Sequence, residues 1–429
     1  MADPHMLPAR WTATDAERWL LSLERLGMRF GLDRMRALMA ALGAPNEAFR
    51  AIHVVGTNGK SSTVRMIAAI LAQHGVRTGV YLSPHLVSFA ERIRVDGADA
   101  SPEQFAAAAG RARAAAELVD RDLDADDGVT QFEALTAAAY AGLADSGVEV
   151  AVVEAGLGGR WDATNVIDAE IAVLTNVDLE HTRWLGSTVG QIAREKLAVL
   201  APRATLVLGA DLQPAVEAEA VLAAERQDAT IVRAPARPDD AGLQLLARGD
   251  FQRSNFAVAC SAAQAYLGSL EQARVRAAAA STSVPGRLEV VADPAGHGEL
   301  VLDGAHNAAG IAALTASLPG LLAGRPLVAV VSVLEDKDAA AMLEKLLALS
   351  AGVVFTASAN PRAVPAATLA ALAGELPEGV AARVEEDPRR ALALARELAG
   401  DDGVVLATGS IYLVADLVRP AGAGPGSML

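Results

Sequence analysis

The sequence has almost no cysteine and no long apolar run. Its 429 residues include one cysteine, Cys260, which excludes a disulfide within the chain and any cysteine-rich metal site. No apolar stretch approaches the roughly 18 to 20 residues of a membrane span. The N-terminal region carries Asp3, Arg10 and Asp15 and lacks the apolar centre of a signal peptide. We therefore expect a cytoplasmic protein without a membrane partner.

Positive charge is also scarce. The chain has 37 lysine and arginine residues against 52 acidic ones, which gives a formal net charge of −15. Binding to a nucleic-acid backbone needs a basic surface, so the composition excludes a general nucleic-acid role. An anionic small molecule would have to meet a local basic site inside an acidic protein. We also expect the chain to be a monomer.

Lysine is the rarer of the two basic residues. Only four of the 37 are lysines, namely Lys60, Lys196, Lys337 and Lys345. Arginine stays charged at any ordinary pH, whereas a lysine can lose its proton and react. The few lysines in a chain that otherwise uses arginine are therefore candidates for chemistry.

The length and the pattern of apolar runs predict two α/β domains. A chain of 429 residues exceeds what one hydrophobic core usually supports. Short buried strands alternate with helical stretches, which is typical of parallel sheets with helices on both faces. The predicted strands are Ile52–Val55, Thr78–Leu82, Val150–Glu154, Ile171–Val177, Thr205–Leu208, Leu300–Leu302, Val328–Val333, Val353–Thr356 and Val404–Thr408. The predicted helices include Ser62–Gln73, Gln131–Leu143, Asp338–Leu349 and Arg389–Leu398. Turn residues at Pro285-Gly286 place the domain boundary there, giving domains 1–287 and 288–429.

The sharpest motif is a phosphate-binding loop at residues 56–62. It reads Gly56-Thr57-Asn58-Gly59-Lys60-Ser61-Ser62, and it lies between a predicted strand and a predicted helix. Glycines let backbone N–H groups turn toward phosphate oxygens, and the helix N-terminus adds its positive dipole end. Lys60 would contact the β- and γ-phosphates, and a serine hydroxyl would bind Mg²⁺. The alternative is a glycine-rich turn with an incidental lysine. Because no Asn-Lys-x-Asp string is present, the nucleotide is predicted to be ATP and not GTP.

Three polar residues are placed to complete a magnesium site. Glu154 ends a predicted strand, while Ser83 and His181 each follow one. They would share the sheet edge of the phosphate loop, and Mg²⁺ needs few protein ligands when phosphate oxygens supply the rest. Histidine is an unusual ligand for Mg²⁺, so a core or substrate-binding role for His181 stays open on chemistry alone.

With these motifs the chain resembles the dihydrofolate synthase/folylpolyglutamate synthase family, within the muramyl-peptide-ligase superfamily. The phosphate loop is typical of the whole superfamily. Motifs of the folate branch follow in family order along nearly the whole chain. They are Tyr81-Leu82-Ser83-Pro84-His85-Leu86, Glu91-Arg92-Ile93, Glu154-Ala155-Gly156-Leu157-Gly158-Gly159-Arg160, Asp162-Ala163-Thr164-Asn165, His181-Thr182, Trp184-Leu185-Gly186, Arg194-Glu195-Lys196, Pro285-Gly286-Arg287, Asp303-Gly304-Ala305-His306-Asn307, Asp336-Lys337-Asp338 and Gly409-Ser410. Two positions depart from the pattern: Ser61 stands where the folate branch has glycine, and Arg183 where an acidic residue is common.

The resemblance implies an N-terminal P-loop ATPase domain and a smaller C-terminal Rossmann-like domain, with ATP in the cleft between them. It implies nucleotide contacts from Thr57, Asn58, Gly59, Lys60, Ser61, Ser62, Asn255, Arg287, Asp303 and His306. It implies a pterin site with Arg29, Phe30, Thr130, Phe132 and Asp162. For Asp303, a structural role as a helix cap is the alternative.

The resemblance also implies two Mg²⁺ ions and a modified lysine. Ser83 and Glu154 would bind one ion and His181 the other, while Lys196, carboxylated on its amine by CO₂, would be a further anionic ligand. Only a neutral amine reacts with CO₂, and burial near cations favours the neutral form. The alternative for Lys196 is an ordinary surface lysine on a helix.

The predicted activity is an ATP-dependent amide ligation. The γ-phosphoryl group would move to a carboxylate of dihydropteroate or of a folate, and the amine of L-glutamate would then attack the acyl phosphate. Lys60, His181 and Lys196 are the candidate catalytic residues. Two other functions remain as alternatives: ligation of amino acids to a muramyl nucleotide, and a non-catalytic P-loop protein that binds nucleotide.

Overall fold

The computed structural model describes residues 11–23, 30–123, 127–238, 242–292 and 298–420. These residues form two compact units. The first comprises the described residues up to Gln244 together with Ser254–Thr282, and the second comprises Leu245–Arg253 together with the described residues from Ser283 onward. Each unit is built around its own sheet.

The first unit contains an eight-stranded sheet in the order β4-β3-β2-β5-β1-β6-β7-β8. Neighbouring strands are parallel except for the antiparallel pairs β2–β3 and β3–β4. Its strands are β1 (Arg50–Val55), β2 (Thr78–Tyr81), β3 (Ile93–Val95), β4 (Ala98–Asp99), β5 (Val150–Glu154), β6 (Ile171–Leu174), β7 (Thr205–Leu208) and β8 (Thr230–Arg233). The chain runs from β1 to β2 and returns to place β5 between them, so the carboxyl ends of β1, β2 and β5 meet at one edge.

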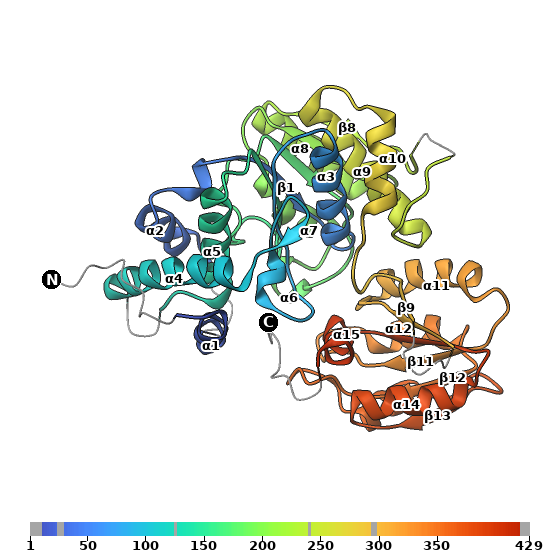
Figure 1. Cartoon of the computed structure of the whole chain (residues 1–429). Coiled ribbons are helices and arrows are strands. Elements are labelled where there is room, and N and C mark those ends of the chain that lie inside the picture. The colour runs from blue at the N-terminus through green and yellow to red at the C-terminus, as the bar shows by residue number, and fades with distance from the viewer. Residues whose placement is uncertain (1–10, 24–29, 124–126, 239–241, 293–297, 421–429) are drawn as a thin grey trace. The chain divides into compact units, whose positions relative to one another are not determined.

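Helices cover this sheet. Figure 1 shows α1, α2, α4 and α5 gathered together, and α4 packs along α5. The helices are α1 (Ala13–Ser22), α2 (Asp33–Ala41), α3 (Lys60–Gln73), α4 (Pro102–Val119), α5 (Gln131–Asp145), α6 (Thr182–Leu185), α7 (Val189–Lys196), α8 (Pro214–Gln227), α9 (Asp250–Leu267) and α10 (Gln272–Ser281). Short 3₁₀ turns lie at Pro45–Glu47, Phe89–Arg92, Asp120–Asp122 and Leu197–Val199.

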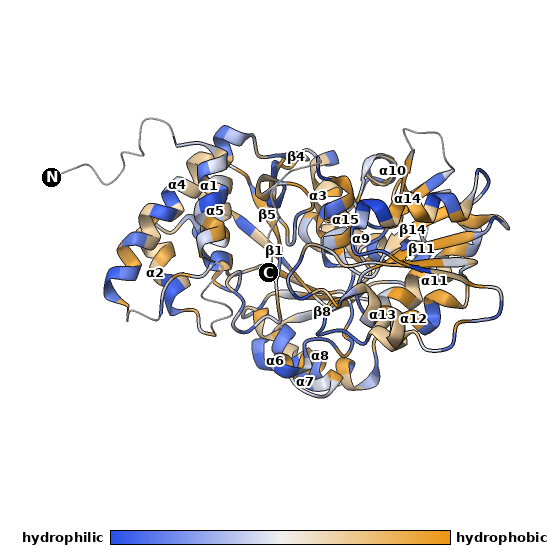
Figure 2. Cartoon of the chain, turned by 90° about the horizontal axis from the view of Figure 1, so that it is seen from below, coloured by the Kyte–Doolittle hydropathy of each residue, from blue (hydrophilic) through white to orange (hydrophobic). Residues whose placement is uncertain are grey.

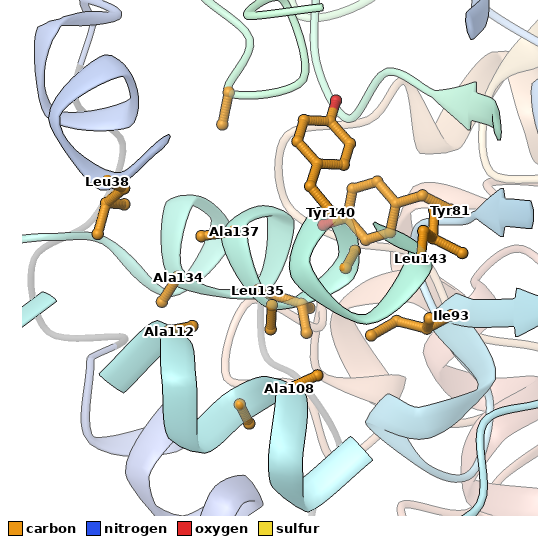
Figure 3. Close-up of a cluster of buried hydrophobic side chains, with 14 of the residues drawn as sticks. Leu38, Tyr81, Ile93, Ala108, Ala112, Ala134, Leu135, Ala137, Tyr140 and Leu143 are labelled. Atoms are coloured by element: carbon orange, nitrogen blue, oxygen red, sulfur yellow. The ribbon is translucent and has the colours of Figure 1, made fainter. Parts of the chain in front are cut away.

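One core cluster of the first unit lies between α5 and the sheet. Tyr81 of β2 and Tyr140 of α5 pack edge to face, with their ring centroids 6.4 Å apart (Figure 3). The small side chains Ala108 and Ala112 of α4 face α5 in the same cluster, which allows the two helices to approach closely. Helix α5 begins at a capping box, in which Thr130 and Glu133 bond each other's backbone N–H groups. The capping box therefore makes the first turn of α5 rigid, and this turn carries the candidate substrate residues Thr130 and Phe132.

The second unit contains a six-stranded sheet in the order β13-β12-β11-β14-β10-β9, parallel except for β10–β9. The strands are β9 (Glu289–Ala292), β10 (Glu299–Leu302), β11 (Leu327–Val331), β12 (Gly352–Phe355), β13 (Ala381–Val384) and β14 (Val404–Thr408). The helices are α11 (Ala308–Leu322), α12 (Ala339–Leu347), α13 (Ala366–Leu372), α14 (Pro388–Ala399) and α15 (Ile411–Val418). Figure 2 shows β11 and β14 as hydrophobic ribbons and places hydrophilic residues on α14, as expected for helices that cover a buried parallel sheet.

The predicted α/β class with parallel sheets is confirmed. Strands β5, β7 and β14 have the predicted bounds. The strand predicted at Ile171–Val177 was too long, since β6 ends at Leu174. Its extension is wrong because Thr175 and Asn176 turn toward the phosphate loop. Among the helices in the described residues, none combines the length and the apolar character needed to span a bilayer.

Candidate active site

The phosphate loop connects β1 to α3, as predicted. Gly56 and Gly59 have φ angles of 152° and 84°, which favour glycine. A β-carbon at Gly56 would collide with the Thr175 hydroxyl, and one at Gly59 with the Asn255 side-chain oxygen. Lys60 begins α3, and its Nζ donates to the carbonyl oxygens of Gly56 and Thr57 at 3.1 Å each. The loop is thus curled around the lysine at a helix N-terminus, which is the geometry that binds phosphate groups.

Two residues after β6 hold this loop in place. The side-chain amide of Asn176 accepts from Asn58 N at 2.9 Å and donates to Asn58 O at 3.2 Å. The Thr175 hydroxyl donates to the same Asn58 carbonyl at 2.7 Å. The Asn176 side chain thus satisfies both the N–H and the C=O of Asn58, as the backbone of a neighbouring strand does in a sheet. These contacts keep the backbone of the loop preorganised.

Glu154 lies at the carboxyl end of β5 and joins three segments. Its side chain is buried, and its Oε1 accepts from the Ser61 hydroxyl at 2.8 Å. Its Oε2 accepts from Ser83 N, just beyond β2, at 3.1 Å. The structure therefore brings Ser61, Ser83 and Glu154 together, an oxygen-rich set of the kind that Mg²⁺ prefers. No group of three histidine, cysteine, aspartate or glutamate side chains in the described part of the chain could hold a metal by itself.

Lys196, the last residue of α7, is buried beside the phosphate loop. Its side chain is 5% exposed, and Nζ donates to the Gly56 carbonyl at 2.8 Å. Burial, together with the nearby charge of Lys60, lowers the pKa of Lys196 to about 7, while Glu180 and Asp162 oppose the shift. The alternative of a surface lysine is therefore wrong. A substantial neutral fraction of the amine is expected at neutral pH.

His181 lies at the start of α6 in a left-handed conformation, with φ at 50°. Its ring is 32% exposed, and Nε2 lies 3.9 Å from Oε1 of Glu180. Glu180 is also close enough to Lys196 to influence its charge. Glu180 is thus close to both His181 and Lys196.

The candidate pterin residues come from several elements of the first unit. Thr130 and Phe132 lie at the start of α5, and the ring of Phe132 packs under Gly156. Phe30 is 48% exposed, and its ring centroid lies 5.5 Å from that of Trp184, which is also exposed. Arg29 lies outside the described residues.

Asp162 is buried and accepts hydrogen bonds from nearby backbone N–H groups and from a hydroxyl. They come from Leu157 N at 2.7 Å, from Thr164 N at 3.0 Å and from the Thr164 hydroxyl. Burial raises the pKa of Asp162, and these bonds oppose the shift. Behind it, His53 of β1 is fully buried, and its Nε2 lies 2.8 Å from the Thr164 hydroxyl. Because that hydroxyl donates to Asp162, Nε2 of His53 must carry the proton.

In the second unit, Asp303 lies directly after β10. Its Oδ2 accepts from Leu288 N at 2.7 Å and its Oδ1 from Ala305 N at 2.8 Å. Burial raises the pKa of Asp303, and the Arg287 guanidinium is the largest opposing influence. The alternative that Asp303 caps a helix is wrong, because Asn307 is the N-cap of α11. Asp303 instead joins two backbone segments, the one that follows Arg287 and the one that precedes His306.

Two family models match the chain: the Mur ligase middle domain over residues 54–263, and the Mur ligase glutamate ligase domain over residues 286–411. The dihydrofolate synthase/folylpolyglutamate synthase of Mycobacterium tuberculosis is 35% identical, over 92% of this chain and 86% of that protein. The chain belongs to the dihydrofolate synthase/folylpolyglutamate synthase family.

Solved structures of the family agree closely with the fold. Folylpolyglutamate synthase of Mycobacterium tuberculosis complexed with ADP and AMPPCP matches with a TM-score of 0.85 and 36% identity, covering 94% of this chain and 98% of that one. A bifunctional folylpolyglutamate synthase/dihydrofolate synthase with Mn, AMPPNP and L-glutamate bound matches with a TM-score of 0.81 and 29% identity, covering 94% and 97%. The resemblance read from the motifs is therefore confirmed.

Sequence reasoning missed several residues that hold the candidate active site in shape. Thr175 and Asn176 appear in the sequence prediction only as part of the strand expected at Ile171–Val177. Their polar side chains directly after a buried strand were a usable signal. The contact between His53 and Thr164 gave no signal, because it joins a central strand to a loop 111 positions later.

Proposed function

We propose that this chain uses ATP to activate a carboxylate of dihydropteroate or of a folate and joins it to the amine of L-glutamate. The observation that carries the proposal is the convergence at Glu154. Its two oxygens accept from the Ser61 hydroxyl of the phosphate loop and from Ser83 N after β2, while Lys196 donates to the Gly56 carbonyl of the same loop. The site thus combines a nucleotide loop, oxygen ligands and a second lysine, as an acyl-phosphate ligase requires.

Lys60 is proposed to bind the transferred phosphoryl group. In the structure its Nζ donates to two backbone carbonyls of its own loop, and it can exchange these weak partners for phosphate oxygens. The backbone of residues 57–62 and the side chain of Asn255 would complete the nucleotide site. Arg287, Asp303 and His306 are proposed nucleotide residues of the second unit. Their role in catalysis is electrostatic stabilisation and positioning.

The proposed metal ligands are Glu154, Ser83 and His181. When bound, Mg²⁺ would neutralise charge that develops on the phosphates. The hydroxyl of Ser61, which directly follows the P-loop lysine, is bonded to Glu154 and has the position of the P-loop serine that binds Mg²⁺. Glu154 can accept a cation in place of these hydrogen bonds without a change of its own burial.

For Lys196 we propose carboxylation by CO₂. The neutral amine attacks the carbon of CO₂ and a proton is released, which leaves an anionic carbamate. Support comes from the burial of Lys196 and from its lowered pKa of about 7, which leaves much of the amine neutral. The product would be an oxygen ligand on the metal side of the phosphate loop.

The acceptor substrate is proposed to lie against Phe30, Thr130, Phe132 and Asp162, with Arg29 as a further contact. Support comes from exposed aromatic surface at Phe30 and from the buried carboxylate of Asp162. The nearby loop that carries Asp162 begins at Glu154, so acceptor and metal residues belong to one segment.

The assay that tests the proposal offers purified protein three acceptors with ATP and Mg²⁺. Dihydropteroate and tetrahydrofolate are each given with L-glutamate, and a muramyl nucleotide is given with its amino acid. We expect glutamate in amide linkage on at least one of the first two. Product only with the muramyl nucleotide would favour that alternative, and ATP binding without any product would favour the non-catalytic one.

We further propose that the chain acts as a cytoplasmic monomer, with functional domains at 1–287 and 288–429. The acidic net charge of −15 supports the absence of a nucleic-acid partner. Light scattering of the purified chain at several concentrations tests the monomer. A mass that rises with concentration would contradict it.

A further inference from the structure

The loop that follows Glu154 contacts the end of α7 through its backbone. A β-carbon added to Gly159 would lie 2.6 Å from the carbonyl oxygen of Lys196 and 2.7 Å from that of Glu195. Both distances are shorter than any real contact, and both neighbours are backbone atoms that cannot rotate away. Only glycine fits between this loop and the helix.

Arg160 adds two bonds at the same place. Its backbone N–H donates to the Glu195 carbonyl at 3.0 Å. Its side-chain Nε donates to Oε1 of Glu195, also at 3.0 Å. The last carbonyls of a helix have no partner within the helix, so the first of these bonds satisfies a group that would otherwise need water.

The loop is itself held in shape. Asp162 N donates to Gly159 O at 3.1 Å, and the Asn165 side chain donates to Arg160 O at 3.2 Å. At the other end of the contact, Lys196 is the final residue of α7 and reaches Gly56 with its Nζ. The backbone of the loop therefore determines the position of the Lys196 backbone, from which the buried side chain extends.

We propose that Gly159 and Arg160 are positioning residues for Lys196. The backbone of Gly159 sets how closely α7 approaches the loop, and Arg160 fastens the helix end through Glu195. Glu154 lies five residues before Gly159, so one short segment fixes the position of the Glu154 carboxylate relative to Lys196. The inference rests on the proposed function in one respect, namely that Lys196 takes part in the ligation.

The test compares Gly159→Ala with Gly190→Ala in the full chain. Gly190 belongs to the same helix, but its added β-carbon would meet its nearest neighbour, Ala215, at an ordinary 3.9 Å. Hydrogen exchange of the backbone amides at 195–199 reports the position of the helix end without any need for activity. We expect about tenfold faster exchange there in Gly159→Ala and no change in Gly190→Ala.

The kinetic arm separates positioning from general damage. We expect Gly159→Ala to lower kcat by about thirtyfold or more, with the KM for ATP within about twofold of the parent chain. If Gly159→Ala does not fold, Arg160→Ala decides the matter, with an expected fall in kcat of about threefold to tenfold that Arg160→Lys restores.

The inference would be overturned if Gly159→Ala kept both the exchange rate at 195–199 and the kcat of the parent chain. Where Gly159→Ala does not fold, the same result in Arg160→Ala would overturn it. Equal effects of Gly159→Ala and Gly190→Ala would overturn it too. A parent chain that joins no glutamate to a folate would defeat the proposed function instead, and the exchange measurement would still decide whether Gly159 positions the helix end.

Discussion

Glu154 and Asp303 are both buried carboxylates at the carboxyl end of a parallel strand, one in each sheet, but their partners differ. Glu154 accepts from a hydroxyl and a backbone N–H that belong to two other segments of the first unit. Asp303 accepts from two backbone N–H groups, that of Ala305 in its own turn and that of Leu288, which directly precedes β9. A hydroxyl can rotate and turn from donor to acceptor, whereas a backbone N–H cannot.

The comparison separates a carboxylate that is available for chemistry from one that holds a turn. Glu154 can exchange the Ser61 hydroxyl for a cation because that hydroxyl can then turn its lone pairs to the same ion. Asp303 would leave two buried N–H groups without a partner if it moved. The first edge is therefore the place for exchangeable ligands, and at the second Asp303 fixes the two segments that carry Arg287 and His306.

The largest effect is expected from Lys60→Ala, with Lys345→Ala in the second unit as the control. Lys345 is an exposed lysine of α12. Loss of the fixed cation at the phosphate loop should lower kcat by about a hundredfold or more, because nothing else replaces its charge on the phosphoryl group. Steady-state ligation assays measure this. Retention of more than about a tenth of kcat, roughly 1.4 kcal/mol of barrier, would contradict the role of Lys60.

Lys196→Arg is expected to be nearly as damaging. Arginine keeps the positive charge and most of the length, but it has no neutral amine to react with CO₂. Lys196→Ala should also be inactive, and acetate or propionate should restore part of its activity by occupying the vacated ligand position. The neutral fraction of the parent lysine rises with pH around its pKa of about 7, so activation by dissolved CO₂ should strengthen from pH 6 to pH 8.

An active Lys196→Arg enzyme would show that Lys196 acts only through its charge. An unmodified ammonium at Lys196 in an active, ATP-bound enzyme, seen by peptide mass or by density, would end the carbamate proposal.

The isosteric pair Glu154→Gln and Asp303→Asn tests the comparison itself. In Glu154→Gln the new amide NH2 can donate to the Ser61 hydroxyl, so the free energy of unfolding should stay within about 1 kcal/mol of the parent value while ligation is lost. In Asp303→Asn the new amide NH2 must face a backbone N–H, which leaves a buried donor unsatisfied and costs about 1–3 kcal/mol of stability. Urea unfolding and ligation assays measure the two effects. Equal losses of stability in both variants would break the distinction.

The smallest effect is expected from His53, a buried polar group in the middle of the sheet, and it concerns the pH dependence of stability. Burial lowers the pKa of His53 to about 3, against 6.5 as its ordinary value. As pH falls below 6.5, the unfolded chain takes up a proton that the folded chain refuses, so this group lowers stability with falling pH. The loss should reach about 2 kcal/mol between pH 7 and pH 5.

His53→Gln provides the control, because its amide can still donate to Thr164 but does not titrate in this range. Urea unfolding at both pH values should show the smaller loss in the variant. The same pH dependence in both proteins would mean that His53 is accessible to protons in the folded chain.

Sequence reasoning found the elements that carry dense local signals. The strand–glycine–lysine–helix pattern located the phosphate loop, and the apolar runs at Val150–Glu154 and Val404–Thr408 had the right bounds. Edge strands such as β8 and β13 were missed, since their partly exposed residues form no apolar run. The partners of the site residues were beyond reach in the same way. That Ser61 meets Glu154, and Gly159 meets Lys196, follows from the order of strands in the sheet and not from any spacing along the chain.

The central claim is that a substrate carboxylate receives the γ-phosphoryl group of ATP before glutamate attacks. The most direct measurement uses a folate or dihydropteroate labelled with ¹⁸O at both oxygens of the reacting carboxylate, with ATP, Mg²⁺ and L-glutamate, and follows the inorganic phosphate by mass. An acyl phosphate transfers one carboxylate oxygen to phosphate when the amine displaces it, so we predict one ¹⁸O atom in the phosphate for every amide formed. Phosphate without ¹⁸O, released alongside the amide product, would contradict the account.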